Sequence, residues 1–143
     1  QGQPDQPKHI LDAQAAYQFA ARLEGIDPQQ VIGIGASIGA DAVVDGCENC
    51  IGSLSLGPGN WLGAPYAQAV TVMEDAQKPA WCIATEEDPR DVETCNSAAG
   101  TLYQKQIYPR GGHAMRLFRA ENNLNPEIGQ YIWDYIRKVY NLP

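Results

Sequence analysis

The sequence predicts an α/β protein with a parallel sheet of about four strands and helices on both faces. Apolar runs rich in β-forming residues alternate along the chain with helix-like segments, which is typical of a parallel sheet. Residues 31–40, V-I-G-I-G-A-S-I-G-A, join an apolar strand to a helix through a glycine-rich turn with Ser37 at its apex. Polar residues suited to chemistry follow several of the expected strands, where ligands gather in proteins of this class.

The composition limits the size of the fold and the kinds of partner. The chain has 143 residues, enough for one hydrophobic core and too few for two ordinary domains. A hydrophobic content of 44% and a charged content of 19% indicate a globular protein. The net charge of −7 argues against nucleic acid or an anionic membrane as partner, and no apolar run approaches membrane-spanning length. Because the chain begins at Gln1 without Met or a signal-like segment, we expect it to be part of a longer protein.

The first half is expected to contain two strands and two helices. Residues 1–8 are rich in Gln and Pro and predict a linker or frayed terminus, which leaves residues 9–143 for the domain. Apolar residues recur at helical spacing over 9–24, and Gly25 closes that helix. A strand then begins at Val31 and ends at Gly35, followed by a short apolar helix over 37–44 and a strand over 51–56.

The second half continues the alternation. A loop rich in Gly and Pro over 57–65 carries Trp61 and leads to a helix over 66–75 and a strand over 80–85. An acidic loop over 86–91 precedes a helix over 95–102 and a strand over 104–108. The last helix is expected to have Asn125 as its N-cap and Pro126 in its first turn.

Ser37 is the candidate nucleophile. A serine on a tight turn between strand and helix has a strained backbone, so the residues two before and two after it must be small. Here these residues are Gly35 and Gly39. The backbone N–H of Ile38, at the start of the helix, is suited to stabilising an oxyanion.

Two other interpretations of this turn stay open. It can be an ordinary connection between a strand and a helix. Alternatively, Gly33, Gly35 and Gly39 spell G-x-G-x-x-x-G, a variant of the dinucleotide-binding turn. That motif needs an acidic residue after the next strand, where this sequence has Gly57-Pro58-Gly59.

A nucleophile, a carboxylate and a histidine are expected at the same end of the sheet. Ser37, residues 86–88 and His113 each follow a predicted strand, in the chain order Ser, Asp, His. A histidine can remove the serine proton, and a carboxylate behind the imidazole fixes its tautomer. Taken singly, His113 can also be a loop histidine and Asp88 a solvated turn residue before Pro89.

These motifs together resemble the C-terminal half of an α/β-hydrolase and are similar to dienelactone hydrolase-like serine esterases. The resemblance covers nearly the whole chain and includes D-P-Q-Q-V-I-G-I-G-A-S-I-G-A, L-S-L-G-P-G-N-W-L-G, K-P-A-W-C-I-A-T-E-E-D-P, Y-P-R-G-G-H-A-M-R-L-F and I-W-D-Y-I. It implies Ser37 as nucleophile, Asp88 as acid and His113 as base. Asp88 is preferred over Glu87 because the family acid lies three residues past a small residue that ends the strand, here Thr85.

The chain departs from the family pattern in two ways. Ala114 follows His113 where the family usually has glycine. The family fold also has further strands before this half, one of which supplies the second oxyanion donor, and no part of this chain corresponds to them. Because losing such a donor lowers the rate by on the order of 10² to 10³, we expect this chain alone to be incomplete and only a weak esterase.

The expected activity is that of a serine hydrolase that cleaves a small ester or lactone through an acyl-enzyme, without a metal or cofactor. The alternative is a catalytically silent domain of the same fold that binds a ligand or partner. Bulky residues expected near the strand ends predict an apolar substrate pocket. These residues are Trp61, Leu62, Tyr66 and Met115. Trp61 can equally serve only to cover the core.

The four cysteines leave the compartment undetermined. Cys82 in a predicted strand and Cys95 in a predicted helix are expected to be packed thiols. Cys47 and Cys50 form C-x-x-C, for which a local disulfide or two free thiols is favoured over a zinc or redox site. A zinc site needs two more ligands, and His9 and His113 are the only histidines.

The strand from Val31 to Gly35 is expected to lie at an open edge of the sheet. It has no charge, proline or bulge to protect its unpaired backbone groups. The sequence therefore predicts that this edge is covered either by a second copy of the chain or by the missing N-terminal half of the protein.

Overall fold

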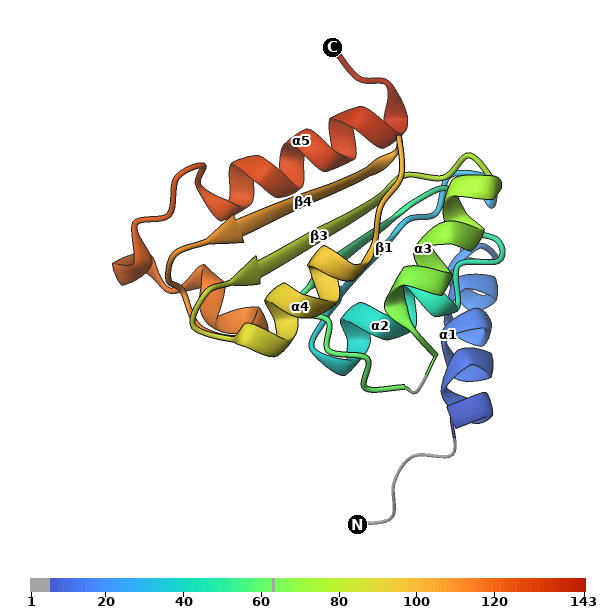
Figure 1. The fold of residues 1–143 in the computed structure, drawn as a ribbon. Coiled ribbons are helices and arrows are strands. Elements are labelled where there is room, and N and C mark those ends of the chain that lie inside the picture. The colour runs from blue at the N-terminus through green and yellow to red at the C-terminus, as the bar shows by residue number, and fades with distance from the viewer. Residues whose placement is uncertain (1–5, 63) are drawn as a thin grey trace.

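The computed structural model describes residues 6–62 and 64–143, which form an α/β fold with a four-stranded, all-parallel sheet (Figure 1). The strands lie side by side in chain order, β1-β2-β3-β4. Their bounds are β1 Gly33–Ala36, β2 Ser53–Leu56, β3 Ala80–Thr85 and β4 Tyr103–Tyr108. The predicted fold class is therefore confirmed.

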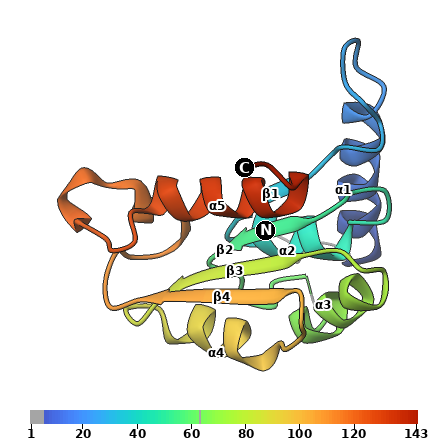
Figure 2. The same ribbon diagram turned by 90° about the horizontal axis from the view of Figure 1, so that it is seen from above.

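Helices cover both faces of the sheet. Figures 1 and 2 show α5 on one face and α2, α3 and α4 on the other, with α1 beside α2. The bounds are α1 Gln6–Ala20, α2 Ile38–Asp45, α3 Tyr66–Asp75, α4 Pro89–Ser97 and α5 Ile128–Tyr140, with short 3-10 helices η1 Ala114–Phe118 and η2 Ala120–Asn122. Among the described residues, no helix has both the length and the apolar character needed to cross a bilayer.

The sheet separates two hydrophobic cores because successive side chains of a strand point to opposite faces. In β3, Trp81 and Ile83 pack against α5, whereas Cys82 belongs to the core under α2, α3 and α4. This explains why β3 is buried along its whole length and carries no charged residue.

Helix α1 is held against α2 by a tyrosine whose ring also lies beside Gly33 at the start of β1. The Tyr17 hydroxyl donates a hydrogen bond of 2.8 Å to the Val43 carbonyl oxygen. A side chain at Gly33 would overlap the Tyr17 ring, so packing alone accounts for this glycine of the G-x-G-x-x-x-G pattern.

The largest difference from the predicted elements concerns α4. This helix begins at Pro89 rather than near Cys95, because Asp88 is its N-cap and Pro89 occupies the first turn. The expected acidic loop over 86–91 is therefore wrong in its second half, and Asp91 lies in the first turn of a helix.

The ends of the other elements differ by a few residues. Helix α1 begins at Gln6, so residues 6–8 are helical rather than linker, while residues 1–5 of the predicted linker lie outside the described residues. It ends at Ala20 instead of residue 24. Helix α5 begins at Ile128 with Glu127 as N-cap, because Asn125 and Pro126 belong to the preceding turn.

The four cysteines form two disulfides. Cys47 and Cys50 are bridged, which agrees with one of the two favoured interpretations of the C-x-x-C motif. Cys82 and Cys95 are also bridged, with their Cα atoms 5.8 Å apart, so the expectation of packed thiols is wrong for this pair. The second bridge joins β3 to α4, and both of its cysteines are fully buried.

Candidate active site

Ser37 lies on a sharp turn between β1 and α2, as the motif predicts. Its backbone has φ 56° and ψ −126°, a left-handed φ that a residue other than glycine seldom adopts. A Cβ at Gly35 would overlap the Gly39 carbonyl oxygen, so a glycine is required before the turn. A Cβ at Gly39 would meet no atom within 4 Å, so the same expectation for Gly39 is not supported by its surroundings.

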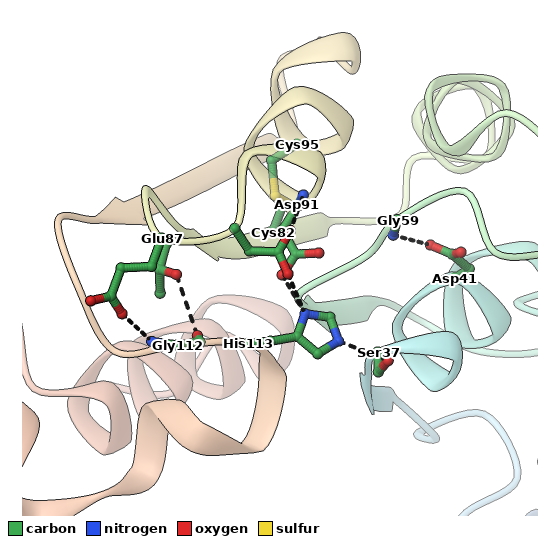
Figure 3. Close-up of polar contacts among 11 residues, drawn as sticks. Ser37, Asp41, Gly59, Cys82, Glu87, Asp91, Cys95, Gly112 and His113 are labelled. Carbon is green, nitrogen blue, oxygen red and sulfur yellow. Dashed lines mark hydrogen bonds and ion pairs between the residues drawn. A yellow bond between two sulfur atoms is a disulfide. The ribbon is translucent and has the colours of Figure 1, made fainter.

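His113 reaches Ser37 from the far edge of the sheet. Its Nε2 lies 2.8 Å from the Ser37 Oγ (Figure 3). The loop before His113 passes through two glycines with positive φ, Gly111 at 133° and Gly112 at 71°. Glu87 anchors this loop, because its Oε2 accepts hydrogen bonds from the N–H groups of Gly111 (3.0 Å) and Gly112 (2.8 Å).

Two carboxylates face the other nitrogen of the imidazole. The Asp91 Oδ2 lies 2.7 Å from the His113 Nδ1 (Figure 3). The Asp88 Oδ2 lies 3.1 Å from the same atom. Carboxylate oxygens accept hydrogen bonds, so Nδ1 carries the proton and donates it, which leaves Nε2 to accept from the Ser37 hydroxyl. The predicted site residues Ser37, Asp88 and His113 are therefore brought together, with Asp91 as a fourth member that the sequence analysis missed.

Asp91 differs from Asp88 in its environment. The Asp91 side chain is 1% exposed and that of Asp88 30%. Burial raises the pKa of Asp91 to about 6, although the hydrogen bond and charge of His113 act in the opposite direction. The signal that could have found Asp91 is the Asp88-Pro89 helix start, which places Asp91 in the first turn of α4.

A buried carboxylate on α2 holds the loop beside the imidazole. Asp41 accepts a hydrogen bond from the N–H group of Gly59 at 3.2 Å (Figure 3). It also accepts one from the Trp61 N–H. Burial raises the pKa of Asp41, while these backbone donors lower it. Asn60 completes the anchor, because its Oδ1 accepts from the Tyr66 N–H at 2.7 Å.

The four residues expected to form a substrate pocket lie in two different environments. The Trp61 ring is 38% exposed, stands edge-on to the His113 ring at 6.3 Å between centroids, and lies under the Arg90 guanidinium at 4.5 Å. Met115 is exposed at the start of η1. Leu62 and Tyr66 are instead buried in the protein interior, where apolar contacts account for their size. A cavity of about 470 Å³ lies between α2 and α3, and none of these four residues lines it.

Three further features bear on chemistry at this site. Ile38 is the first residue of α2, where a backbone N–H has no partner within the helix. Ala114, which follows His113, has φ 51°, a conformation that favours glycine. The donor atoms of Asp88, Asp91 and His113 lie within 4.8 Å of one another, so these residues could also hold a cation.

Comparison with known proteins identifies the fold but no family. The sequence matches neither a protein-family model nor a curated protein. Its structure is similar to that of an esterase from Pyrococcus furiosus, Pf2001, in two crystal forms. The first crystal form has a TM-score of 0.65 and 14% sequence identity, and the match covers 95% of this chain and 62% of the esterase chain. The second has a TM-score of 0.58 and 15% identity, and the match covers 90% of this chain and 60% of the esterase chain. The chain thus has the fold of an esterase and spans less than two thirds of that esterase's length.

Proposed function

We propose that this chain carries the catalytic residues of a serine esterase that cleaves small esters or lactones through an acyl-enzyme. The observation that carries the proposal is the continuous hydrogen-bonded series from Ser37 through His113 to a carboxylate. A hydroxyl, an imidazole and a carboxylate in this geometry suit nucleophilic acyl transfer. The similarity of the fold to an esterase supports the same class of reaction.

The proposed reaction has two steps. The Ser37 Oγ attacks the carbonyl carbon of the ester while His113 Nε2 takes the hydroxyl proton, and the resulting tetrahedral oxyanion lies near the Ile38 N–H. The bond to the leaving alkoxide then breaks, and His113 protonates that alkoxide. Water attacks the acyl-enzyme in the same way, giving the acid and free Ser37.

The family pattern implies Asp88 as the acid of this series, but two carboxylates, Asp88 and Asp91, lie within hydrogen-bond distance of the His113 Nδ1. The exposed Trp61 beside His113 is suited to contact an uncharged acyl or alcohol group. The finer assignment, to an esterase of the dienelactone hydrolase type, rests on the sequence motifs.

The open edge of the sheet at β1 is suited to a partner. Strand β1 pairs only with β2 among the described residues, and Ile34 on it is exposed. Every second residue of β1 directs its backbone N–H toward β2, as Gly33 does and as Ser37 does just after the strand. The N–H groups of Ile34 and Ala36 therefore point to the open side of the strand. We propose that a second copy, or a further part of the same protein, covers this edge.

A fluorophosphonate probe tests the activity. We expect the probe to label wild-type protein at Ser37, and expect no labelling of Ser37→Ala or His113→Ala. Ser97→Ala is the matched control, because this exposed hydroxyl donates only to the Thr94 carbonyl oxygen, at 2.7 Å. Absence of labelling in the full-length wild-type protein would support the silent, ligand-binding alternative instead.

A further inference from the structure

The carboxylates of Asp88 and Asp91 both face the Nδ1 of His113, but they differ in distance and in burial. Asp91 is nearer, at 2.7 Å against 3.1 Å, and it is buried whereas Asp88 is partly open to water. A hydrogen bond to an ionised group is stronger where water is excluded. We infer that Asp91, rather than Asp88, is the positioning residue that fixes the orientation and tautomer of His113. This inference rests on the site of the proposed function.

Asp91 depends on His113 for its own hydrogen bonding. Its Oδ2 contacts the imidazole, and its Oδ1 is buried without a hydrogen-bond partner among the described residues. A buried carboxylate with so few partners is destabilised unless a donor compensates it. The Nδ1–H of His113 is that donor, so the two side chains stabilise each other.

The space that Asp91 occupies is made by a glycine at the end of β2. A Cβ at Gly57 would lie 2.6 Å from the Asp91 Oδ2 and 3.2 Å from the His113 Cε1. Gly57 also has φ 65°, which disfavours any larger residue there. The close approach of carboxylate and imidazole therefore requires this glycine.

The helix that carries Asp91 is fixed to the sheet. The buried disulfide between Cys82 in β3 and Cys95 in α4 joins these two elements within the same core. Asp91 lies one helical turn before Cys95, so its backbone is restrained near the bridge. A positioning residue must be held rigidly, and this attachment supplies the rigidity.

Asp88 caps the N-terminus of α4, which explains why an aspartate lies at this position. Its Oδ1 accepts from the Asp91 N–H at 3.5 Å, and its carbonyl oxygen accepts from the Val92 N–H at 3.2 Å. These contacts make Asp88 the N-cap of α4, which satisfies a free N–H group of the first turn. Asp88 thus orients the turn that presents Asp91.

The test compares Asp91→Asn with Asp88→Asn, the same change on two side chains that face the same atom. The protein contains only two histidines, so ¹⁵N-histidine labelling gives one pair of signals from His113 and one from the reference His9. We expect His113 to keep the Nδ1–H tautomer in wild type and Asp88→Asn. In Asp91→Asn we expect it to change to the Nε2–H tautomer or a mixture, because the new amide can donate to Nδ1.

Hydrolysis of p-nitrophenyl acetate gives a second reading. Asp91→Asn should lower kcat by on the order of 10³ to 10⁴, and Asp88→Asn by less than roughly tenfold, with little change in KM for either. Loss of the Nδ1–H tautomer in Asp88→Asn, or its full retention in Asp91→Asn, would overturn the inference. If Asp91→Asn does not fold, the smaller Asp91→Ser replaces it, with the same expected and contrary outcomes.

The NMR result does not depend on the proposed activity. If the tautomer changes only in Asp91→Asn while no variant hydrolyses esters, the inference stands and the proposed function fails. If wild type is an esterase and the tautomer changes only in Asp88→Asn, the function stands and the inference fails.

Discussion

The Ser37 Oγ and the His113 Nε2 lie 2.8 Å apart although 76 residues separate them in the sequence. Their strands, β1 and β4, are at opposite edges of the described sheet, so the His113 loop must cross the ends of β2 and β3. Glu87 holds this loop by its two glycine N–H groups. The contact therefore depends on the whole width of the sheet rather than on one local motif.

If Ser37 and His113 act as one unit, their effects on catalysis should not multiply. We expect Ser37→Ala and His113→Ala each to lower kcat for p-nitrophenyl acetate by on the order of 10⁴ to 10⁶. The double variant should be no slower than the slower single variant, because either change alone removes the activated nucleophile. Steady-state kinetics check this, and losses that multiply would show that the two residues act independently.

Gly35 and Gly39 should respond in opposite ways to alanine. Gly35→Ala places a methyl group against the Gly39 carbonyl oxygen, so we expect the free energy of unfolding to fall by roughly 2 kcal/mol or more. Gly39→Ala meets no atom within 4 Å and lies in helix α2, so it should be neutral or stabilising by up to about 1 kcal/mol. Urea denaturation of both variants measures this, and equal destabilisation would contradict the geometry of the turn.

Trp61 tests whether the loop after β2 contributes to substrate binding. Because its exposed ring flanks His113, we expect Trp61→Ala to raise KM for short p-nitrophenyl esters roughly tenfold, with a smaller effect on kcat. Trp133→Ala removes an exposed indole from α5, far along the chain from the candidate site residues, and is the control. Unchanged kinetics in Trp61→Ala would mean that this side chain only covers the core.

Asp45 should make the protein less stable as the pH rises. Burial, with a contribution from the charge of Asp41, raises the pKa of Asp45 from 3.8 to about 7. The folded state therefore binds more protons than the unfolded state between these values, and the contribution of Asp45 to stability is lost as the pH rises through that window. The variant Asp45→Asn cannot ionise and should keep that stability.

Urea denaturation at pH 4 and pH 8 checks the sign of this effect. The free energy of unfolding of Asp45→Asn, taken relative to that of wild type, should be higher at pH 8 than at pH 4 by on the order of 2 kcal/mol. Asp12→Asn, which removes the same charge from an exposed position on α1, is the control. If this difference in the free energy of unfolding were instead lower at pH 8, the fold would stabilise the ionised form of Asp45.

The β1 edge predicts self-association of the isolated chain. Sedimentation velocity should show oligomers of wild type at micromolar concentration, and Ile34→Lys should shift them to monomer because an edge lysine opposes strand pairing. Val72→Lys, at an exposed apolar position on α3, is the control. A stable wild-type monomer with full esterase activity would contradict both the proposed partner and the expected need for a second oxyanion donor.

Local chemistry was sufficient to predict the elements whose pattern is strong. The bounds of α3 and β3 agree with the predicted helix over 66–75 and strand over 80–85. The parallel sheet follows from alternating strands and helices, and the left-handed φ of Ser37 follows from the glycine-rich turn. These features depend on neighbours in the sequence, so the sequence by itself determined them.

The start of α4 shows where a local signal was present and was missed. Asp88 and Pro89 form an ordinary N-cap and first turn, although the run of acidic residues over 86–91 suggests a loop. A loop would leave the direction of the Asp91 side chain undefined, so the acidic run alone does not indicate Asp91 as a partner of His113.

Tertiary structure alone decided which groups meet. The Cys82–Cys95 bridge requires β3 and α4 to pack with a Cα separation of 5.8 Å, which no spacing in the sequence specifies. Likewise, Asp88 and Asp91 are the same chemical group three positions apart, and only the packing of α4 buries one and leaves the other in contact with water. Burial controls both the strength of a hydrogen bond and the pKa of a carboxyl group, so the partner of His113 is set by the fold around it.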